Sequence, residues 1–190
     1  MMIDKKLNLV IPVYQGEKVL YVHSAPIGRV VFERYFMTIS KAFTSVYSRG
    51  LGTMAGPRVA SMLVKKIAID DGDWEGPAGV ERGFFAEIRR LSNLIAPTEN
   101  GWQAIPLEEA LAKKILDEDD ASEVENAICF FILASAMHRK KELAGVLDSV
   151  KDFWGAQTSS LNCMEYMDSL RISKTEESSG EKATPSSIPS

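Results

Sequence analysis

The chain is poor in the residues that build metal centres, disulfide frameworks and many active sites. Its 190 residues include only two cysteines, Cys129 and Cys163, and two histidines, His23 and His138. The cysteines have neither a metal-ligand spacing nor the pattern of a disulfide-rich domain, and neither histidine belongs to an HExxH or similar motif. We therefore predict no metal, no cofactor and no disulfide, and a reducing cytoplasm as the compartment.

The motifs of the common enzyme classes are also missing. No GxSxG nucleophile elbow occurs, and no dinucleotide-binding fingerprint follows a predicted strand. The glycine-rich stretch Ser48–Gly56 is followed by no GK[ST]. The acidic stretch Asp70–Gly79 is spaced like the start of a calcium loop, but Arg82 stands where the bidentate glutamate belongs. The sequence therefore predicts a protein that is not an enzyme.

No apolar stretch is long enough to cross a bilayer. From Ala127 to Met137 only Ser135 is polar, and this run is roughly half of the about 20 residues that a spanning helix needs. Ser122 and Glu125 have the spacing of a capping box, which predicts a helix start just before the run. A helix that is apolar on every side must be buried on every side, so this segment is predicted to be the central helix of the core. No secretory signal is visible at Met1–Lys6.

Helical periodicity dominates most of the remaining chain. Leu7–Val22 is the exception, because two β-branched runs flank Gly16 and predict a β-hairpin, with Pro12 placing its first strand at an edge. The predicted fold is mainly α: a multi-helix bundle around a buried central helix, with a small N-terminal β-hairpin (7–22) and a disordered C-terminal tail. Apolar residues recur at helical spacing in segments 24–47, 57–69, 78–95, 106–116 and 141–154.

The composition divides the chain into a helical domain, 1–155, and a tail, 156–190. The end, Ser173–Ser190, is polar and rich in serine and proline, which predicts disorder. Before it lies a short apolar segment, 161–170, which Asn162 and Glu165 would cap as a helix. Such a helix suggests a docking segment for a partner, although folding back onto its own domain is equally compatible. The candidate partner-binding residues are Leu161, Asn162, Met164, Tyr166, Met167 and Leu170.

Charge is distributed unevenly along the chain. Residues 1–66 contain ten Lys/Arg and three Asp/Glu, a charge of +7, whereas residues 67–190 carry a charge of −11. This asymmetry predicts contact with a charged partner: nucleic acid, an acidic protein, or the acidic half of another copy. An uneven distribution over a solvated surface fits equally well.

Two segments at the ends of the chain carry a recognisable pattern. The front segment, LNLVIPVYQGEKVLYVHSAPIGRVVFERYF, leads from a short hairpin straight into a helix. The back segment contains Trp154, Gly155, Ser159, Ser160, Leu161, Asn162, Glu165, Tyr166, Ser169 and Leu170 at the spacing W-G-x-x-x-[TS]-S-L-N-x-x-E-Y-x-x-S-L. In both segments the chain resembles the tail assembly chaperones of long-tailed bacteriophages, the class to which lambda's frameshifted chaperone belongs.

The resemblance implies a function without catalysis. Such chaperones coat the long, helical tape measure protein before the tail tube polymerises around it, and they are absent from the finished particle. The partners it implies are the tape measure protein, the tail tube protein and other copies of the chain, in the host cytoplasm and away from membranes. The alternative, based on charge alone, is a nucleic-acid-binding regulatory protein that uses the basic first third.

Overall fold

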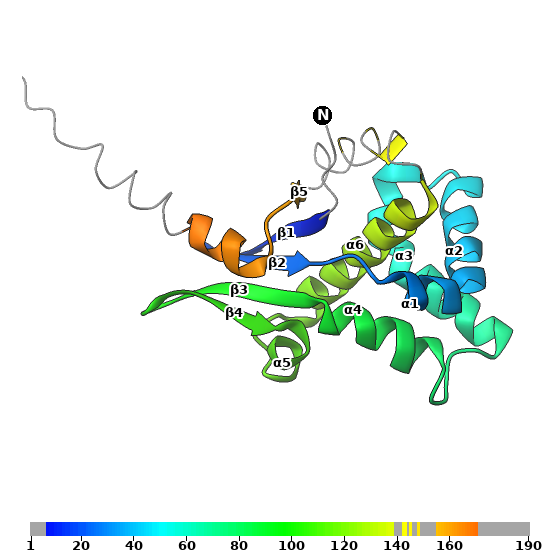
Figure 1. Cartoon of the computed structure of the whole chain (residues 1–190), viewed down its shortest axis with the longest axis horizontal. Coiled ribbons are helices and arrows are strands. Elements are labelled where there is room, and N and C mark those ends of the chain that lie inside the picture. Colours follow the sequence, from blue (N-terminus) through cyan, green and yellow to red (C-terminus); the bar gives the residue numbers. More distant parts are fainter. Residues whose placement is uncertain (1–6, 139–141, 144, 146–147, 149–154, 171–190) are drawn as a thin grey trace, which may run out of the picture.

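The protein has an α+β fold in which a five-stranded antiparallel sheet separates a helical layer from a short C-terminal helix (Figure 1). The computed structural model describes residues 7–138, 142–143, 145, 148 and 155–170. The prediction of a mainly helical bundle with one small hairpin is therefore wrong. The predicted helix 141–154 falls largely outside the described residues, and the predicted disordered end 173–190 falls wholly outside them.

The N-terminal hairpin is the centre of the sheet. Strand β1, Asn8–Gln15, pairs with β2, Lys18–Ser24, in the register Gln15↔Lys18 through Leu9↔Ser24. Gly16 in the two-residue turn has φ 62°, a conformation that glycine adopts without steric cost. The predicted hairpin is confirmed, but the predicted edge position of its first strand is wrong at Asn8–Val10, which pair with residues 157–159.

A second hairpin occupies a region that was predicted as helix and loop. Strand β3, Ser92–Thr98, pairs with β4, Gly101–Pro106, and β3 also pairs with β2. The predicted helix 78–95 therefore ends early: a π-helical turn η1, Glu81–Phe85, leads into α4, Ala86–Arg90. With β5, Gln157–Ser159, on the far side of β1, the strand order is β4-β3-β2-β1-β5.

The remaining helices differ from the predicted ones mainly at their ends. The helix predicted over 24–47 begins only at residue 29 and breaks at Tyr35, whose hydroxyl is tied to the carbonyls of Ala78 and Gly79. The helix predicted from Pro57 starts earlier, so that Pro57 lies inside it. The bounds are α1, Arg29–Arg34; α2, Phe36–Ser48; α3, Gly52–Asp71; and α5, Leu107–Ala112.

Helix α6, Glu118–Met137, is the predicted central helix. It packs against β1 on one side and against α2 and α3 on others, which explains why every side chain from Ile128 to Ala134 is buried. Its N-cap is Asp117, whose Oδ1 accepts from the backbone N of Asp120 at 2.7 Å. The predicted capping box at 122–125 is therefore wrong, because these residues lie inside the helix. Within the described residues, no helix is long and apolar enough to span a membrane.

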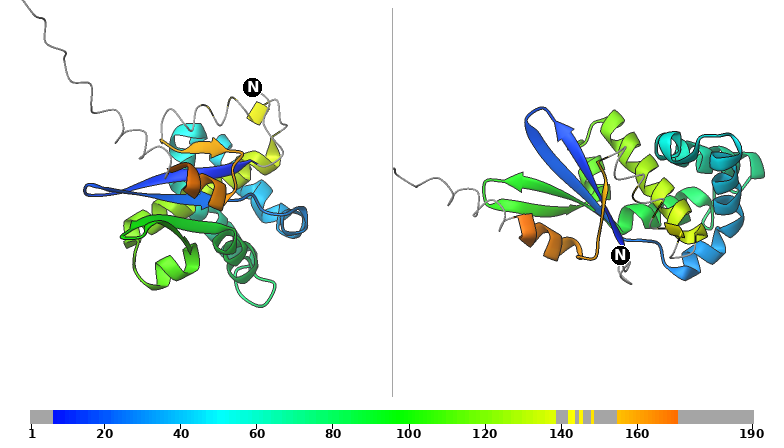
Figure 2. Two further views of the ribbon diagram at one scale, coloured as in Figure 1. Left: turned by 60° about the vertical axis from the view of Figure 1, so that its left-hand side comes forward. Right: turned by 90° about the horizontal axis from the view of Figure 1, so that it is seen from above.

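Side chains alternate between the two faces of the sheet. One face packs on α6 and contributes to the main core, with Leu9, Ile11, Val13, Leu20, Val22, Leu94 and Ala96. The opposite face, which we call the outer face, carries Val10, Tyr21, His23, Ile95, Trp102 and Ala104. Figure 2 shows α6 and the short helix of residues 163–170 on opposite sides of the strands.

Candidate functional site

The predicted docking segment lies on the outer face of its own sheet. The predicted segment, 161–170, is preceded by β5, and from here on we use the name docking segment for both together, residues 157–170. In it, β5 runs antiparallel to β1 in the register Asn8↔Ser159 to Val10↔Gln157. Residues 163–170 then form a helix against the outer face (Figures 1 and 2). The front and back segments of the chain are thus joined through hydrogen-bonded strands.

The short helix is capped as its sequence predicts. Asn162 Oδ1 accepts from the backbone nitrogens of Met164 and Glu165, both at 3.0 Å, and Glu165 Oε2 accepts from the backbone N of Asn162 at 2.9 Å. This reciprocal arrangement satisfies donors that the first turn of a helix leaves free. The predicted cap is confirmed, and it sets the residue at which the helix begins.

Apolar contact holds the helix on the sheet. Tyr166 and Met167 are only 7% and 5% exposed, and they form a second core cluster with Val10, Ile95 and Trp102 of the outer face. The Tyr166 ring meets Tyr21 edge-on, with 5.9 Å between the ring centroids. Aromatic pairs in this geometry are favourable beyond the area that they bury.

Two polar side chains of the sheet hold the backbone just before the helix. The carbonyl of Leu161 accepts from Asn8 Nδ2 at 3.0 Å and lies 2.9 Å from His23 Nε2. Because a carbonyl can only accept, Nε2 of His23 carries the proton in this contact. Asn8 Nδ2 also reaches the carbonyl of Ser159 at 3.3 Å. Both side chains are buried, so the segment supplies acceptors to polar groups that water does not reach.

Two ionisable groups of the segment stay neutral near pH 7. Burial raises the pKa of Tyr166, the neighbouring Tyr21 adds to this effect, and the hydrogen bond from Gln157 Nε2 at 2.8 Å opposes it. Burial also raises the pKa of the Cys163 thiol. Tyr166 and Cys163 therefore bring no charge to the contact between the segment and the sheet.

The six predicted partner-binding residues divide into three groups. Tyr166 and Met167 are buried on the outer face, and Leu161 and Leu170 lie half-buried against it. Asn162 is exposed and serves as the helix cap, whereas Met164 is 57% exposed. In this structure the segment folds back onto its own domain, which is the alternative that the sequence left open.

The surface beneath the segment was not found from the sequence. Asn8, Tyr21, His23 and Trp102 contact it from three different strands. A signal was present in Lys18–Ser24, where Leu20 and Val22 alternate with Tyr21 and His23. Large side chains at each of these positions indicate that both faces of β2 are covered: Leu20 and Val22 by the main core, Tyr21 and His23 by the docking segment.

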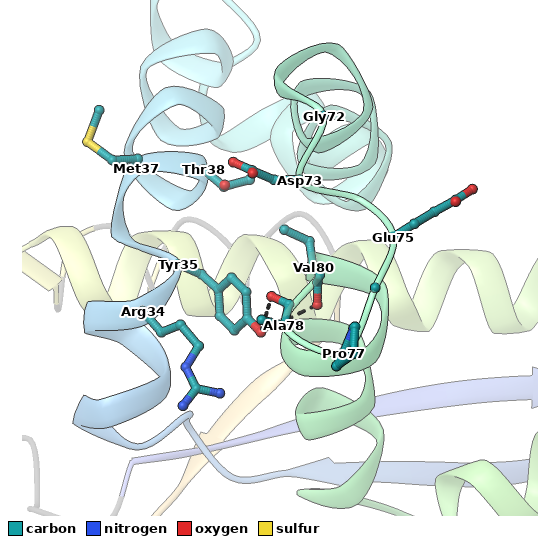
Figure 3. Close-up of a pocket in the computed structure, with 12 residues that line it drawn as sticks. Arg34, Tyr35, Met37, Thr38, Gly72, Asp73, Glu75, Pro77, Ala78 and Val80 are labelled. Carbon is teal, nitrogen blue, oxygen red and sulfur yellow. Dashed lines mark hydrogen bonds between the residues drawn. The ribbon is translucent and has the colours of Figure 1, made fainter.

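A separate hollow lies between the α1–α2 junction and the loop that follows α3 (Figure 3). It has a volume of about 460 Å³. Tyr35 crosses it and donates to the carbonyl of Ala78 at 3.1 Å. Figure 3 shows the charged groups of Arg34 and Glu75 pointing away from each other. Arg34 and Glu75 therefore do not converge on a shared ligand position in this hollow.

A partly buried charge cluster lies between α3, α4 and α6. Glu125 accepts from Lys65 Nζ at 2.6 Å and from Arg89 Nη2 at 3.3 Å. Next to it, burial first and the charge of Glu125 second raise the pKa of the Cys129 thiol well above its usual range. Cys129 is therefore a small apolar core side chain and not a reactive thiol.

The second histidine is also held by neighbours within the fold. His138 Nδ1 lies 3.0 Å from the carbonyl of Ala134, and its ring meets Phe43 edge-on at 5.3 Å between centroids. Among the described residues, no three His, Cys, Asp or Glu side chains gather as a metal site would require.

Methionines are unusually exposed on the helical layer. Met37 on α2 and Met54 and Met62 on α3 are 64%, 65% and 52% exposed, and Met164 on the docking segment is similar. Methionine is flexible and polarizable, so exposed methionines suit surfaces that adapt to varied apolar partners.

Comparison of this chain with models of protein families, with curated proteins and with solved structures found no match.

Proposed function

We propose that this chain is a phage tail assembly chaperone that binds the tape measure protein, keeps it soluble and helps to recruit tail tube subunits. The proposal places it in the host cytoplasm, outside the finished virion. It is a function of surface contact and requires no reactive centre. Self-association of copies along the client belongs to the same proposal.

The observation that carries the proposal is the meeting of the two segments that resemble the family. They are far apart in sequence, yet Asn8 pairs with Ser159 and Val10 with Gln157. Asn8 and His23 of the front segment also bind the Leu161 carbonyl of the back segment. If both segments belong to one family pattern, we expect them to lie together in the fold. In this chain the two segments contact each other directly.

The exposed methionines of α2 and α3 offer the client an apolar contact surface. A tape measure protein is a long helix whose apolar side chains change along its length. Its chaperone therefore needs a surface that accepts different apolar side chains, and not one fixed pocket. Met37, Met54 and Met62 offer flexible side chains on neighbouring helices. We assign client contact to these exposed positions along α2 and α3.

The nucleic-acid alternative has less support. Several basic side chains of the first third are paired within the chain: Lys41 with Asp71, Lys65 with Glu125 and Arg29 with Glu33. Each pair reduces the positive potential that phosphate contacts require.

The test is co-expression with the tape measure protein encoded in the same genome. Wild-type chain should raise the soluble fraction of the tape measure protein and co-purify with it. The triple variant Met37→Gln, Met54→Gln, Met62→Gln should lose most of this effect, because it removes apolar contact at exposed positions without disturbing the core. Thr44→Gln, exposed on α2, is the matched control.

Equal solubility of the tape measure protein with and without the wild-type chain would refute the chaperone function. Equal activity of the triple variant and the control would refute the assigned surface alone. Deleting residues 156–190 is a poorer test, because Ala156 belongs to the main core and the docking segment covers the outer face.

A further inference from the structure

We infer that the docking segment is an exchangeable element: in assembled copies, the segment of one chain occupies the outer face and the β1 edge of its neighbour. The occupant is the same 157–170 segment that occupies this site within the single chain. The inference deepens the self-association in the proposed function, and it does not depend on the identity of the client.

The first support is the open edge of β1 and its chemistry. The two-residue turn is flanked by the hydrogen-bonded pair Gln15–Lys18. Counting from Gln15 toward the N-terminus, the backbone groups of every second residue of β1 therefore bond to β2. The backbone groups of Asn8, Val10, Pro12 and Tyr14 therefore face the outer edge. In the described residues, β5 covers only Asn8–Val10 of this edge.

Proline limits where another strand can be added. Pro12 has no N–H, so the outer edge lacks a donor at the next position after Val10. Gln15, at the end of β1, is held by its side chain to the carbonyl of Ile115 at 3.0 Å and to Asp120 at 2.9 Å. A second chain that pairs with this edge without meeting the missing donor at Pro12 must therefore use Asn8–Val10 and displace β5.

The second support is that the site selects for this segment. Beside the strand pairing, two buried side chains, Asn8 and His23, converge on one carbonyl, and the apolar face accepts Tyr166 and Met167. An unrelated strand would supply the pairing alone. The segment of another copy supplies the pairing, the carbonyl and the buried side chains together, so exchange retains these three kinds of contact.

The chain also has the length that exchange needs. Leu143 and Ala156 are both buried in the main core, and the 12 residues between them could span at most about 40 Å if extended. This distance exceeds the diameter of a small domain, which is about 30 Å. Reciprocal exchange closes a dimer, whereas exchange in one direction continues from copy to copy and yields an open array. An open array is the form that a coat along a tape measure protein requires.

The test uses isotope labelling to distinguish a crosslink within one chain from a crosslink between two chains. Leu170, which is half-buried against the outer face, is replaced by the photocrosslinking amino acid p-benzoylphenylalanine. This unlabelled chain is refolded in an equal mixture with ¹⁵N-labelled chain that lacks the crosslinker. After illumination, the oligomeric fraction is isolated, and crosslinked peptides from residues 18–24 and 101–106 are identified by mass spectrometry.

Exchange predicts that about half of the crosslinked sheet peptides are heavy, because partners are drawn at random from the mixture. Adding Tyr166→Ala should reduce crosslinks to the sheet from both isotopes, whereas adding Met164→Ala should leave them unchanged. Light peptides alone in the oligomers, or no oligomer at any concentration, would overturn the inference. No tape measure protein is present, so such a failure is distinct from a failure of client binding.

Discussion

Replacing Tyr166 with alanine removes the largest side chain with which the docking segment covers the outer face. Tyr166 is 7% exposed and meets Tyr21 edge-on. Truncating an aromatic side chain in a closed core costs about 3–5 kcal/mol. The lower end applies here, because the helix of residues 163–170 lies on the surface and its surroundings can relax.

This cost should fall on local opening of the segment and not on global unfolding. A loss of about 3 kcal/mol raises the population of the open state about a hundredfold, since each 1.4 kcal/mol is a factor of ten. The main core, centred on Ile128 and Leu133, makes no use of this side chain. The variant should therefore keep its folded core while the docking segment detaches far more often.

Hydrogen exchange measures this difference directly. Amides of 157–159 and 163–170 should exchange about a hundredfold faster in Tyr166→Ala, whereas amides of α6 keep their wild-type rates. Met164→Ala is the control, because Met164 is 57% exposed in the same helix. Equal acceleration in α6 and in the segment, or no acceleration in the segment, would refute the reasoning.

Three further perturbations act on the main core. Gly83→Ala would place a methyl group 1.5 Å from the hydroxyl oxygen of the buried Tyr35, so urea denaturation should show a loss of about 1–3 kcal/mol, as in other overpacked cores. Asn126→Ala should cost about 1–3 kcal/mol in the same assay, because Asn126 Oδ1 accepts from the backbone N and Oγ of Ser61, both at 2.9 Å, in a buried site. Burial raises the pKa of the Cys129 thiol, so the unfolded chain ionises first and stability should fall as the pH rises above about 8.5.

Matched variants check each of these predictions. Gly28→Ala adds a methyl group with no atom within 4 Å, so its midpoint should stay near wild type, and an equal loss would contradict the steric argument. Ser61→Ala combined with Asn126→Ala should lose less than the sum of the two single losses; additivity would contradict the hydrogen bonds. Cys129→Ala should flatten the alkaline decline in stability, whereas Cys163→Ala should largely retain it.

The central helix was predictable because its signal is local. A helix made of an unbroken apolar run is compatible only with the protein interior. Residues 128–134 are accordingly buried on all sides. The helix start was not predictable in the same way. Asp117 and Ser122 are both good capping residues, and the acidic residues 118–120 extend the helix by one turn before the expected box.

The second hairpin was missed because two periodicities overlap. Val80, Phe84 and Ile88 have helical spacing and are buried as such, and Leu91 and Ile95 continue that spacing by coincidence. From residue 92 the chain alternates instead, with Leu94 toward the main core and Ile95 toward the outer face. The dipeptide Asn100-Gly101 is a hairpin signal that favours strands on both sides.

The docking segment shows the limit of local reasoning most clearly. Its helix and its cap at Asn162 follow from a few neighbouring residues. Its site on the sheet depends on contacts such as Asn8 with Leu161, which are 153 residues apart. No periodicity within the segment carries that information, because the fold of the intervening chain brings the two together.

The most direct test of the proposed function is light scattering during dilution of the denatured tape measure protein from the same genome. With no addition, the tape measure protein should aggregate and scatter strongly. Addition of this chain should suppress scattering in proportion to its amount, until the tape measure protein is coated. Scattering that is unchanged by an excess of the folded chain would contradict the account.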